Sequence, residues 1–322
     1  MTELLSTESD SEILKKLNLE EEKFDHYLQL FTQWISSQTH LQQNFNETCK
    51  KKFLLWAKLD FEKAKKKFQK YCYTPVTFKE FIQNRTITIE GDLKALNFIH
   101  MLPLPNLTPE GYRIWLYSVY DADNFDSFAM VRMVTIAANY VIHKQGLVAG
   151  ESGIFDMAQL KPHHYAKMFT PAFLTGVKYN LLTVPFLIKN IYVVNCHPLL
   201  EKGIALVKAI LPKKLADRIT ILTKDQDVTK FLPAECLPKI YGGNLNSVES
   251  LQDQWMQCLM KEKDFLEEFG ETVPLGPIPD EFQTSENEFG VEAYTPGTQS
   301  FKTSTSTRST NRFIIWNYAY YC

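Results

Sequence analysis

Between residues 112 and 222, short segments rich in β-branched and aromatic residues alternate with longer segments of helical periodicity. We expect strands at residues 112–119, 153–157, 190–195 and 218–222, and helices at residues 126–143, 170–182 and 198–211. Strands separated by helices of a dozen or more residues are typical of a sheet that is mostly parallel. The alternation therefore predicts an α/β fold with a mostly parallel or mixed sheet.

The residues before this region have a helical pattern. An apolar stripe at helical spacing follows Asp60, which is a favoured N-cap residue: Phe61, Ala64, Phe68 and Tyr71. Residues 50–70 also contain nine lysines against two acidic residues, a local excess of seven positive charges. This excess is compatible either with a solvated helix face or with a patch that faces a membrane.

Composition and pattern together divide the chain into five segments. We expect an acidic flexible leader at 1–23, an N-terminal helical module at 24–95, the α/β domain at 96–247, a C-terminal helix and packing segment at 248–290 with one long helix at 248–269, and a disordered Ser/Thr-rich tail at 291–322.

Charge and hydropathy exclude several classes of protein. The 35 basic and 37 acidic residues give a net charge of -2, which does not favour wrapping of a nucleic acid. No apolar run approaches the ~18 residues that span a bilayer, and the acidic N-terminus is unlike a secretory signal. We therefore expect a cytoplasmic, monomeric protein whose six cysteines, none in a C-x-x-C pair, are reduced thiols.

Motifs for catalysis and for cofactors are incomplete. Gly150-Glu151-Ser152-Gly153 resembles a nucleophile elbow, but Ile154 stands where that motif needs glycine. The aspartates at 121, 123 and 126 favour turns and helix capping over a calcium loop. On an α-helix, the adjacent His163 and His164 would point about 100° apart and would not chelate one ion. With no phosphate-binding glycine loop, we expect no cofactor, no metal and no catalytic residues.

The expected helix at 198–211 is unusual because its apolar face is wide. An arc of about 160° contains eight of its residues: Leu199, Leu200, Gly203, Ile204, Leu206, Val207, Ile210 and Leu211. Lys189 precedes this helix, and Lys213, Lys214 and Arg218 follow it. An apolar helix flanked by cations suits a protein that opens against an anionic membrane, although core packing is the commoner role of such a face.

One segment of the N-terminal module and several of the α/β domain form an ordered series of landmarks: 53–64, 112–116, 154–157, 170–171, 191–195, 211–219 and Leu237-Pro238-Lys239-Ile240-Tyr241-Gly242-Gly243. In this order they resemble the N-terminal module and the lipid-binding domain of the CRAL-TRIO family. The resemblance implies a helical module followed by a sheet and helices that form an apolar ligand cavity, closed by a lid at 198–211.

The resemblance also implies which residues would form the site. A cavity for a tocopherol-, retinoid-, carotenoid- or phospholipid-like molecule would be lined by Phe155, Phe173, Val177, Leu181, Phe186, Ile188, Ile191, Leu200, Gly203, Ile204, Val207 and Leu211. Basic residues that engage an anionic membrane surface, such as phosphoinositide headgroups, would be Lys189, Lys214 and Arg218, whereas Leu187 departs from the basic pattern. At Glu151 the family usually has an apolar residue, so either the strand starts late or a carboxylate faces the cavity.

Three hypotheses for function follow. The leading one is a cytosolic carrier, transiently peripheral to membranes, that transfers one hydrophobic small molecule between them and is not an enzyme. The alternative is a membrane-recruited, lipid-sensing scaffold or adaptor without net transfer. A lipid-modifying hydrolase is the third, and the sequence contains no recognisable nucleophile with its base.

Overall fold

The computed structural model describes residues 4–168, 170–197, 200–222 and 226–277, and the expected tail at 291–322 lies outside these residues. Its centre is one five-stranded sheet in the order β1-β2-β3-β4-β5. The strands are β1 (Ile99–Leu107), β2 (Tyr112–Val119), β3 (Gly150–Asp156), β4 (Ile188–Val194) and β5 (Ile219–Ile221). β1 pairs antiparallel with β2, and the other pairs are parallel. The predicted α/β class with a mostly parallel sheet is confirmed.

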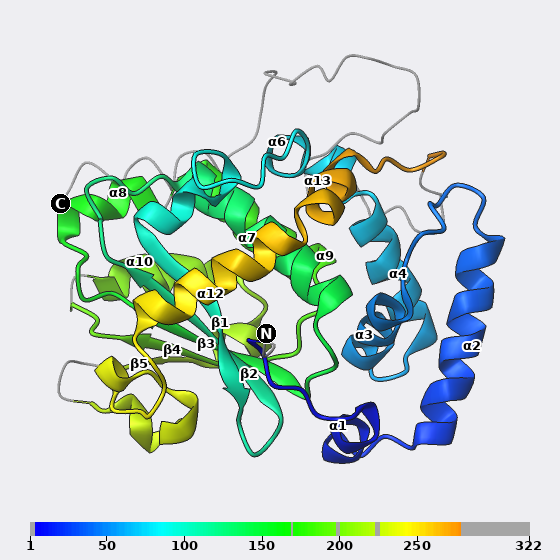
Figure 1. Cartoon of the computed structure of the whole chain (residues 1–322), viewed down its shortest axis with the longest axis horizontal. Helices are drawn as coiled ribbons and strands as arrows, with labels where there is room; N and C mark the ends of the chain where they lie inside the picture. The colour runs from blue at the N-terminus through cyan, green and yellow to red at the C-terminus, as the bar shows by residue number, and fades with distance from the viewer. Residues whose placement is uncertain (1–3, 169, 198–199, 223–225, 278–322) are drawn as a thin grey trace.

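Some helices cover the sheet, and the N-terminal helices form a group beside it (Figure 1). The α-helices are α1 (Asp10–Lys16), α2 (Glu21–Ser37), α3 (Glu47–Ala57), α4 (Phe61–Cys72), α5 (Thr74–Thr77), α6 (Lys79–Ile82), α7 (Ser127–Lys144), α8 (Tyr165–Met168), α9 (Pro171–Thr183), α10 (Leu200–Ile210), α11 (Lys213–Ala216), α12 (Val248–Lys261) and α13 (Lys263–Glu271). The 3-10 helices are η1 (Asp92–Asn97), η2 (Pro162–His164), η3 (Val228–Lys230), η4 (Ala234–Cys236) and η5 (Lys239–Tyr241).

The N-terminal segment differs from the flexible leader that composition suggested. Ser9 and Glu12 form a reciprocal capping box that starts α1, and this helix buries Ile13 and Leu14. Ahead of it, the backbone of Ser6 donates to the carbonyl of Pro105 at 2.9 Å. A short leader can therefore be ordered despite its acidic composition, because a few local caps and two buried side chains suffice.

The two faces of the sheet are covered by different parts of the chain. On one face, Trp115 of β2 contacts Trp255 of α12, and α7, α9 and α10 also lie on this side (Figure 1). On the other face, Tyr192 of β4 packs against Phe231, which follows η3. Parallel sheets are normally buried on both faces, which explains why the core strands are so apolar.

No strand was expected at β1, which contains Pro103 and Pro105. Proline cannot donate to a strand ladder, but it is tolerated on an edge strand, and β1 lies at the edge of the sheet. The pairing of β1 with β2 becomes irregular between Pro103 and Leu107.

The expected long helix at 248–269 is two helices. α12 ends at Lys261, the backbone of Glu262 leaves helical geometry, and α13 begins at Lys263. The Glu262 carboxylate pairs with Lys144 of α7 at 2.7 Å. The apolar stripe is interrupted at Glu262, which forms this ion pair, and the chain bends there.

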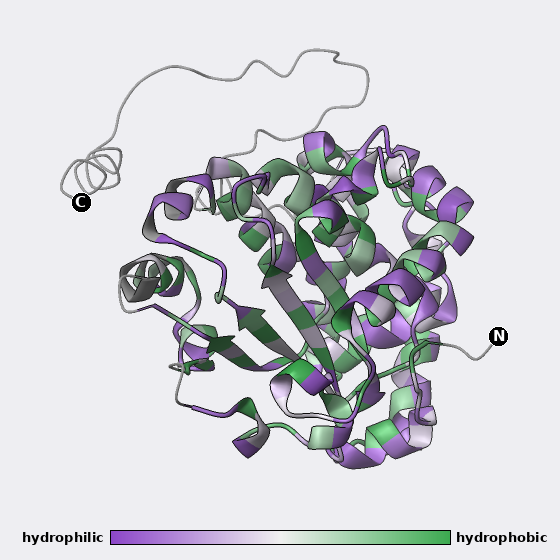
Figure 2. Cartoon of the chain, turned by 60° about the vertical axis from the view of Figure 1, so that its left-hand side comes forward, coloured by the Kyte–Doolittle hydropathy of each residue, from purple (hydrophilic) through white to green (hydrophobic). Residues whose placement is uncertain are grey.

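Figure 2 shows where the hydrophobic residues gather. They concentrate on the strands and on the helix sides that face them, whereas hydrophilic residues dominate the outer turns. Across the described ranges, none of the helices is both long enough and apolar enough to span a bilayer.

The Leu237-Pro238-Lys239-Ile240-Tyr241-Gly242-Gly243 motif has a structural explanation. The Tyr241 hydroxyl donates to the Asp156 carboxylate at the end of β3 at 2.7 Å. Gly242 has a φ of 79°, in the left-handed region. A side chain at Gly243 would collide with the backbone of Leu237, because a Cβ there would lie only 1.9 Å from the carbonyl oxygen. The motif therefore fastens the covering segment to the sheet.

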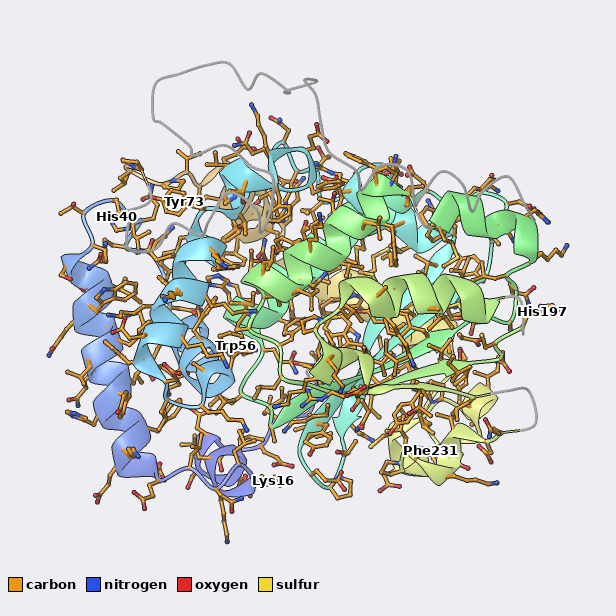
Figure 3. All side chains as sticks on the ribbon, turned by 180° about the vertical axis from the view of Figure 1, so that it is seen from behind. Lys16, His40, Trp56, Tyr73, His197 and Phe231 are labelled. Carbon is orange, nitrogen blue, oxygen red and sulfur yellow. The ribbon has the colours of Figure 1, made fainter. Side chains whose placement is uncertain are left out.

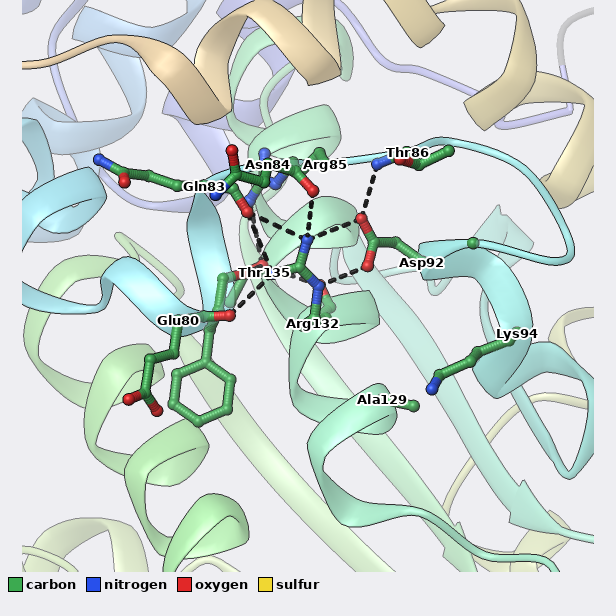
Figure 4. A network of polar contacts seen from close by, with 12 residues as sticks. Glu80, Gln83, Asn84, Arg85, Thr86, Asp92, Lys94, Ala129, Arg132 and Thr135 are labelled. Atoms are coloured by element: carbon green, nitrogen blue, oxygen red, sulfur yellow. Dashed lines mark hydrogen bonds and ion pairs between the residues drawn. The ribbon is translucent and has the colours of Figure 1, made fainter.

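An arginine network joins the α/β domain to the segment before it (Figure 4). Arg132 of α7 holds the Asp92 carboxylate through two nitrogens, and it donates to the backbone carbonyls of Glu80, Gln83 and Asn84. Both side chains of the pair are only 12% exposed. Bidentate pairs that also satisfy buried carbonyls are among the stronger polar interactions.

We predict that Arg132→Met lowers the free energy of unfolding by about 3 kcal/mol, because it leaves the Asp92 carboxylate and three carbonyls without this donor. The matched control is Lys94→Met, since Lys94 pairs with Asp126 at 3.5 Å and both side chains are more than 40% exposed. This control should cost less than about 1 kcal/mol. Urea unfolding of both variants measures the difference, and equal losses would contradict the prediction.

Candidate functional site

Helix α9 shows two kinds of burial. One face packs against α7 so closely that a Cβ at Gly176 would lie 2.6 Å from Val131, and Tyr179 on this face is 1% exposed. Beside it, Phe173, Val177 and Leu181 recur at helical spacing and are only half-buried. These three residues were expected to line a ligand cavity.

Helix α10 occupies the position of the expected lid at 198–211. Ile204 is buried, and Gly203, Val207 and Leu211 are half-buried on the same side. Ala205 and Ala209 on the opposite side are exposed. The Leu200 side chain, together with Pro198 and Leu199, lies outside the described part of the chain.

The remaining expected cavity residues lie on or before β3 and β4. Phe155 stacks on Tyr117 with ring centres 4.6 Å apart, and the register of the strands places Ile191 on the same face. Phe155, Ile191, Phe186 and Ile188 are half-buried. Seen from behind, α9 and α10 lie across this face, and Phe231 marks the other side of the sheet (Figure 3).

Packing therefore changes along one face of the sheet. Near α12, Trp115 is 4% exposed and Trp255 is fully buried. Near α9 and α10, the expected cavity residues are mostly half-buried, although they are apolar. Apolar side chains in a finished core are normally fully buried, so this part of the face is less tightly filled than the rest.

The expected basic residues influence one another electrostatically. Burial lowers the pKa of Lys189, and the nearby charges of Lys58, Arg218 and Lys214 lower it further. The stem of Lys189 crosses Gly150, where a Cβ would lie 2.4 Å from it, and its ammonium lies 5.2 Å from the Tyr112 ring centre. The Arg218 guanidinium donates to the carbonyl of Ile188, and so it also holds β4 to β5.

Lys58 is a member of this cluster that sequence reasoning missed. It caps α3 in the left-handed conformation, far from β4 in sequence. No local pattern reports that a helix end of the N-terminal module lies beside a strand of the sheet. Lys58, Lys189, Lys214 and Arg218 are named the basic cluster below.

The structure decides the open question about Glu151. β3 begins at Gly150, so the strand does not start late, and Glu151 is 5% exposed within it. The indole of Trp115 donates to its Oε2 at 3.0 Å. A pocket of about 20 Å³ lies beside the carboxylate, lined by Lys52, Leu55, Val148, Glu151, Pro185, Phe186 and Leu187.

Burial is the largest influence on the pKa values of Glu151 and Lys52. It raises the pKa of Glu151 to about 7, although the charges of Lys52 and Arg113 and the Trp115 hydrogen bond oppose the rise. Burial likewise lowers the pKa of Lys52 to about 8, while the Glu151 charge acts in the opposite direction. Lys52 donates to the Val141 carbonyl in α7.

The interpretation of His163 and His164 as divergent is wrong. They lie on η2 rather than on an α-helix, their ring centres are 4.0 Å apart, and a ligand atom of each lies within 4.8 Å of Asp123. Nδ1 of His164 accepts from the backbone of Lys161 at 3.2 Å. The proton of the neutral ring is then on Nε2, which donates to Asp123 at 2.9 Å and is not available to a metal.

Two other motifs have structural roles. Asp126 caps α7 by accepting hydrogen bonds from the backbone N–H groups of Phe128 and Ala129, as the sequence predicted. Ser152 lies inside β3 and is 1% exposed, whereas a nucleophile elbow places its serine at an exposed strand-to-helix turn.

The fold and the order of its landmarks agree with a comparison against known families. The family model described as CRAL/TRIO domain matches residues 97–243. Over these residues the chain therefore contains a CRAL/TRIO domain.

The individual relatives share about a quarter of the aligned residues with this chain. Alpha-tocopherol transfer protein-like proteins of Pongo abelii and Homo sapiens are each 27% identical over 237 residues, which cover 69% of this chain and 66% of the relative. The Mus musculus protein of the same name is 25% identical and covers 73% and 69%. The chain thus spans just under two thirds of the first two relatives. A crystal structure of Sfh5 has a TM-score of 0.46 and 11% identity, and covers 76% of this chain and 92% of that one.

The Glu151 site gives a pH prediction. Because the folded-state pKa of Glu151 is about 7 against a usual value of 4.5, the folded chain binds this proton more tightly than the unfolded chain. The protonated Glu151 carboxyl therefore stabilises the folded state fully below pH ~4.5, and this stabilisation is lost as pH rises through ~7. Relative to Glu151→Gln, the parent should lose about 1–3 kcal/mol of unfolding free energy between pH 5 and 7.5.

Urea unfolding at several pH values measures this loss. The pKa of Lys52, at about 8, lies above this window, so its protonation changes little there. If parent and variant give parallel profiles, the Glu151 carboxyl does not have a raised pKa.

Proposed function

We propose that this chain binds one hydrophobic small molecule between the sheet and helices α9 and α10, and transfers it between membranes. The ligand would be tocopherol-, retinoid-, carotenoid- or phospholipid-like. The protein would act in the cytoplasm as a monomer that touches membranes transiently. No covalent bond is made or broken in this function.

The observation that carries the proposal is the change of packing along one sheet face. Apolar residues of β3, β4, α9 and α10 stay half-buried where they converge, while the neighbouring aromatic core is complete. An apolar ligand would bury these side chains without a hydrogen-bond requirement of its own.

A carrier meets a clear physical need. A molecule with about twenty apolar carbons gains on the order of 16 kcal/mol on leaving water, at ~0.8 kcal/mol per methylene. Unassisted passage through water is therefore slow. The names of the human and orangutan relatives refer to tocopherol transfer, which agrees with a hydrophobic ligand here but does not identify it.

The basic cluster supports contact with an anionic membrane. Its cations come from α3, β4, α11 and the residue before β5, and they act on Lys189 together. Each cation near an anionic surface contributes roughly 1 kcal/mol to binding. Phosphoinositide headgroups are the proposed target, and Leu187 leaves one position of the family's basic pattern without a charge.

The direct test is the identity of what co-purifies with the protein. Native mass spectrometry of the full chain, followed by organic extraction, should find one stoichiometric hydrophobic molecule. Vesicle assays should then show its transfer between donor and acceptor membranes. Stable vesicle binding without transfer would favour the adaptor hypothesis, and a chain that binds no lipid would overturn the proposal.

We predict that Val207→Asp reduces bound lipid at least tenfold, because the new carboxylate would face the apolar side of α10. Ala205→Asp is the matched control, since Ala205 is on the exposed side of the same helix. Extraction and quantitation of lipid from both purified variants measure the effect. If Val207→Asp retains as much lipid as Ala205→Asp, α10 does not cover the ligand.

We also predict that Lys189→Gln with Lys214→Gln weakens binding to anionic vesicles about thirtyfold, since two cations contribute roughly 2 kcal/mol. Arg218 is left in place because it bonds to Ile188. Lys230→Gln with Lys239→Gln removes the same charge from exposed positions that are not part of the basic cluster. Vesicle sedimentation at low salt compares the pairs, and equal binding by both would exclude the basic cluster from membrane contact.

A further inference from the structure

The pocket beside Lys52 and Glu151 contains polar groups that an apolar cavity wall does not need. We propose that this pocket binds the polar end of the ligand, and that this end is a hydroxyl group. The inference rests on the proposed function and adds to it the class of ligand, an apolar alcohol.

The pocket adjoins the apolar region through Phe186. This side chain lines the pocket, packs against both hydrophobic clusters of the molecule, and lies 6.3 Å from the Trp115 ring centre. Trp115 in turn donates to Glu151. A ligand lying along the sheet face beside Phe186 would therefore reach the carboxylate with one end.

The two charged groups match both halves of a hydroxyl. The Glu151 carboxylate can accept a second hydrogen bond besides the one from Trp115, because its two oxygens provide about four acceptor positions. The Lys52 ammonium has three protons, and one is directed to the Val141 carbonyl. A hydroxyl can donate to the first group and accept from the second.

The size of the pocket limits the headgroup. Its volume of about 20 Å³ suffices for one water-sized group, so a phosphate or a sugar would not fit without rearrangement. A ligand carboxylate would place a second anion beside Glu151, and such repulsion disfavours it. The hydroxyl is the small group that meets both partners without a like charge.

Stability alone does not explain these residues. Buried charges are costly unless well compensated, and the neighbours of Glu151 on the pocket wall are mainly apolar. Apolar residues in place of Glu151 and the buried cations beside it would avoid the cost of burying these charges. A binding role accounts for the carboxylate, the ammonium and the indole together.

The test uses three probes that share one chain and differ at one end: 1-octadecanol, octadecanoate and octadecane. The full chain is stripped of lipid and incubated with an equimolar mixture at pH 7.5, and bound probe is extracted and quantified by mass spectrometry. We expect the parent to prefer the alcohol over each of the others at least tenfold, as a hydrogen bond to a charged group implies.

Variants assign the preference to the pocket. Glu151→Leu should abolish the preference for alcohol over octadecane and raise the relative binding of octadecanoate. Glu151→Gln, which keeps the shape of the side chain, should reduce the alcohol preference several-fold. Lys51→Met is the control, because Lys51 is on the same helix as Lys52 but pairs with Asp10 and Glu47. It should keep the parental preference.

The outcomes separate the two proposals. If the purified protein carries lipid but prefers no head group, or if Glu151→Gln keeps the full alcohol preference, the pocket holds water only and the hydroxyl inference is overturned. Binding of none of the probes by a chain that carries another lipid would overturn it as well. If the protein carries no lipid and binds no probe, the proposed function itself fails.

Discussion

The parallel pairing of β2, β3 and β4 is the constraint on which the candidate site depends. Its register aligns Arg113 with Glu151 and Trp115 with Gly153, and so places their side chains on one face. Two residues further along each strand, Tyr117 meets Phe155. One sheet face therefore runs from buried charges at the start of the strands to apolar and aromatic groups at their end. A register shift of one residue would send both sets to the opposite face.

Two buried lysines of the N-terminal module join it to the helices above this face. Lys52 donates to Val141 in the last turn of α7, and Lys67 donates to Leu181 in the last turn of α9 at 2.8 Å. Cations are favoured at helix C-termini, where carbonyls lack partners within the helix. Burial lowers the pKa of Lys67 to about 7, and the charges of Lys70 and Lys63 lower it further. Part of the lysine excess at residues 50–70 thus has a structural role. Neither of the two expected explanations, a solvated helix face or a membrane-facing patch, accounts for these buried lysines.

The sequence predicted those features that arise from local patterns. Periodicity located β2 to its exact ends and α7, α9 and α10 to within a few residues, because caps such as Asp126 and Thr170 act on neighbouring backbone. It failed where tertiary contacts override local signals, as in the proline-containing edge strand β1. The expected site residues came from resemblance, which did not indicate Lys52, Lys58 or Trp115, since their roles arise from segments far apart in the chain.

The half-burial of apolar residues near α9 and α10 has a thermodynamic consequence. Burial of apolar surface in a filled core stabilises a protein by roughly 25 cal/mol per Å². Apolar surface that stays accessible to water lacks this stabilisation. A ligand that covers this area would bind the folded chain and not the unfolded one, so binding would raise stability by mass action. The tight core around Trp115 and Trp255 and the Arg132–Asp92 network lie outside this region. They can keep the sheet intact while α10, whose Lys208 makes a long 3.3 Å hydrogen bond to the Ile219 carbonyl, covers the looser part. Under the proposed function, stability and ligand binding would depend on different parts of one sheet face.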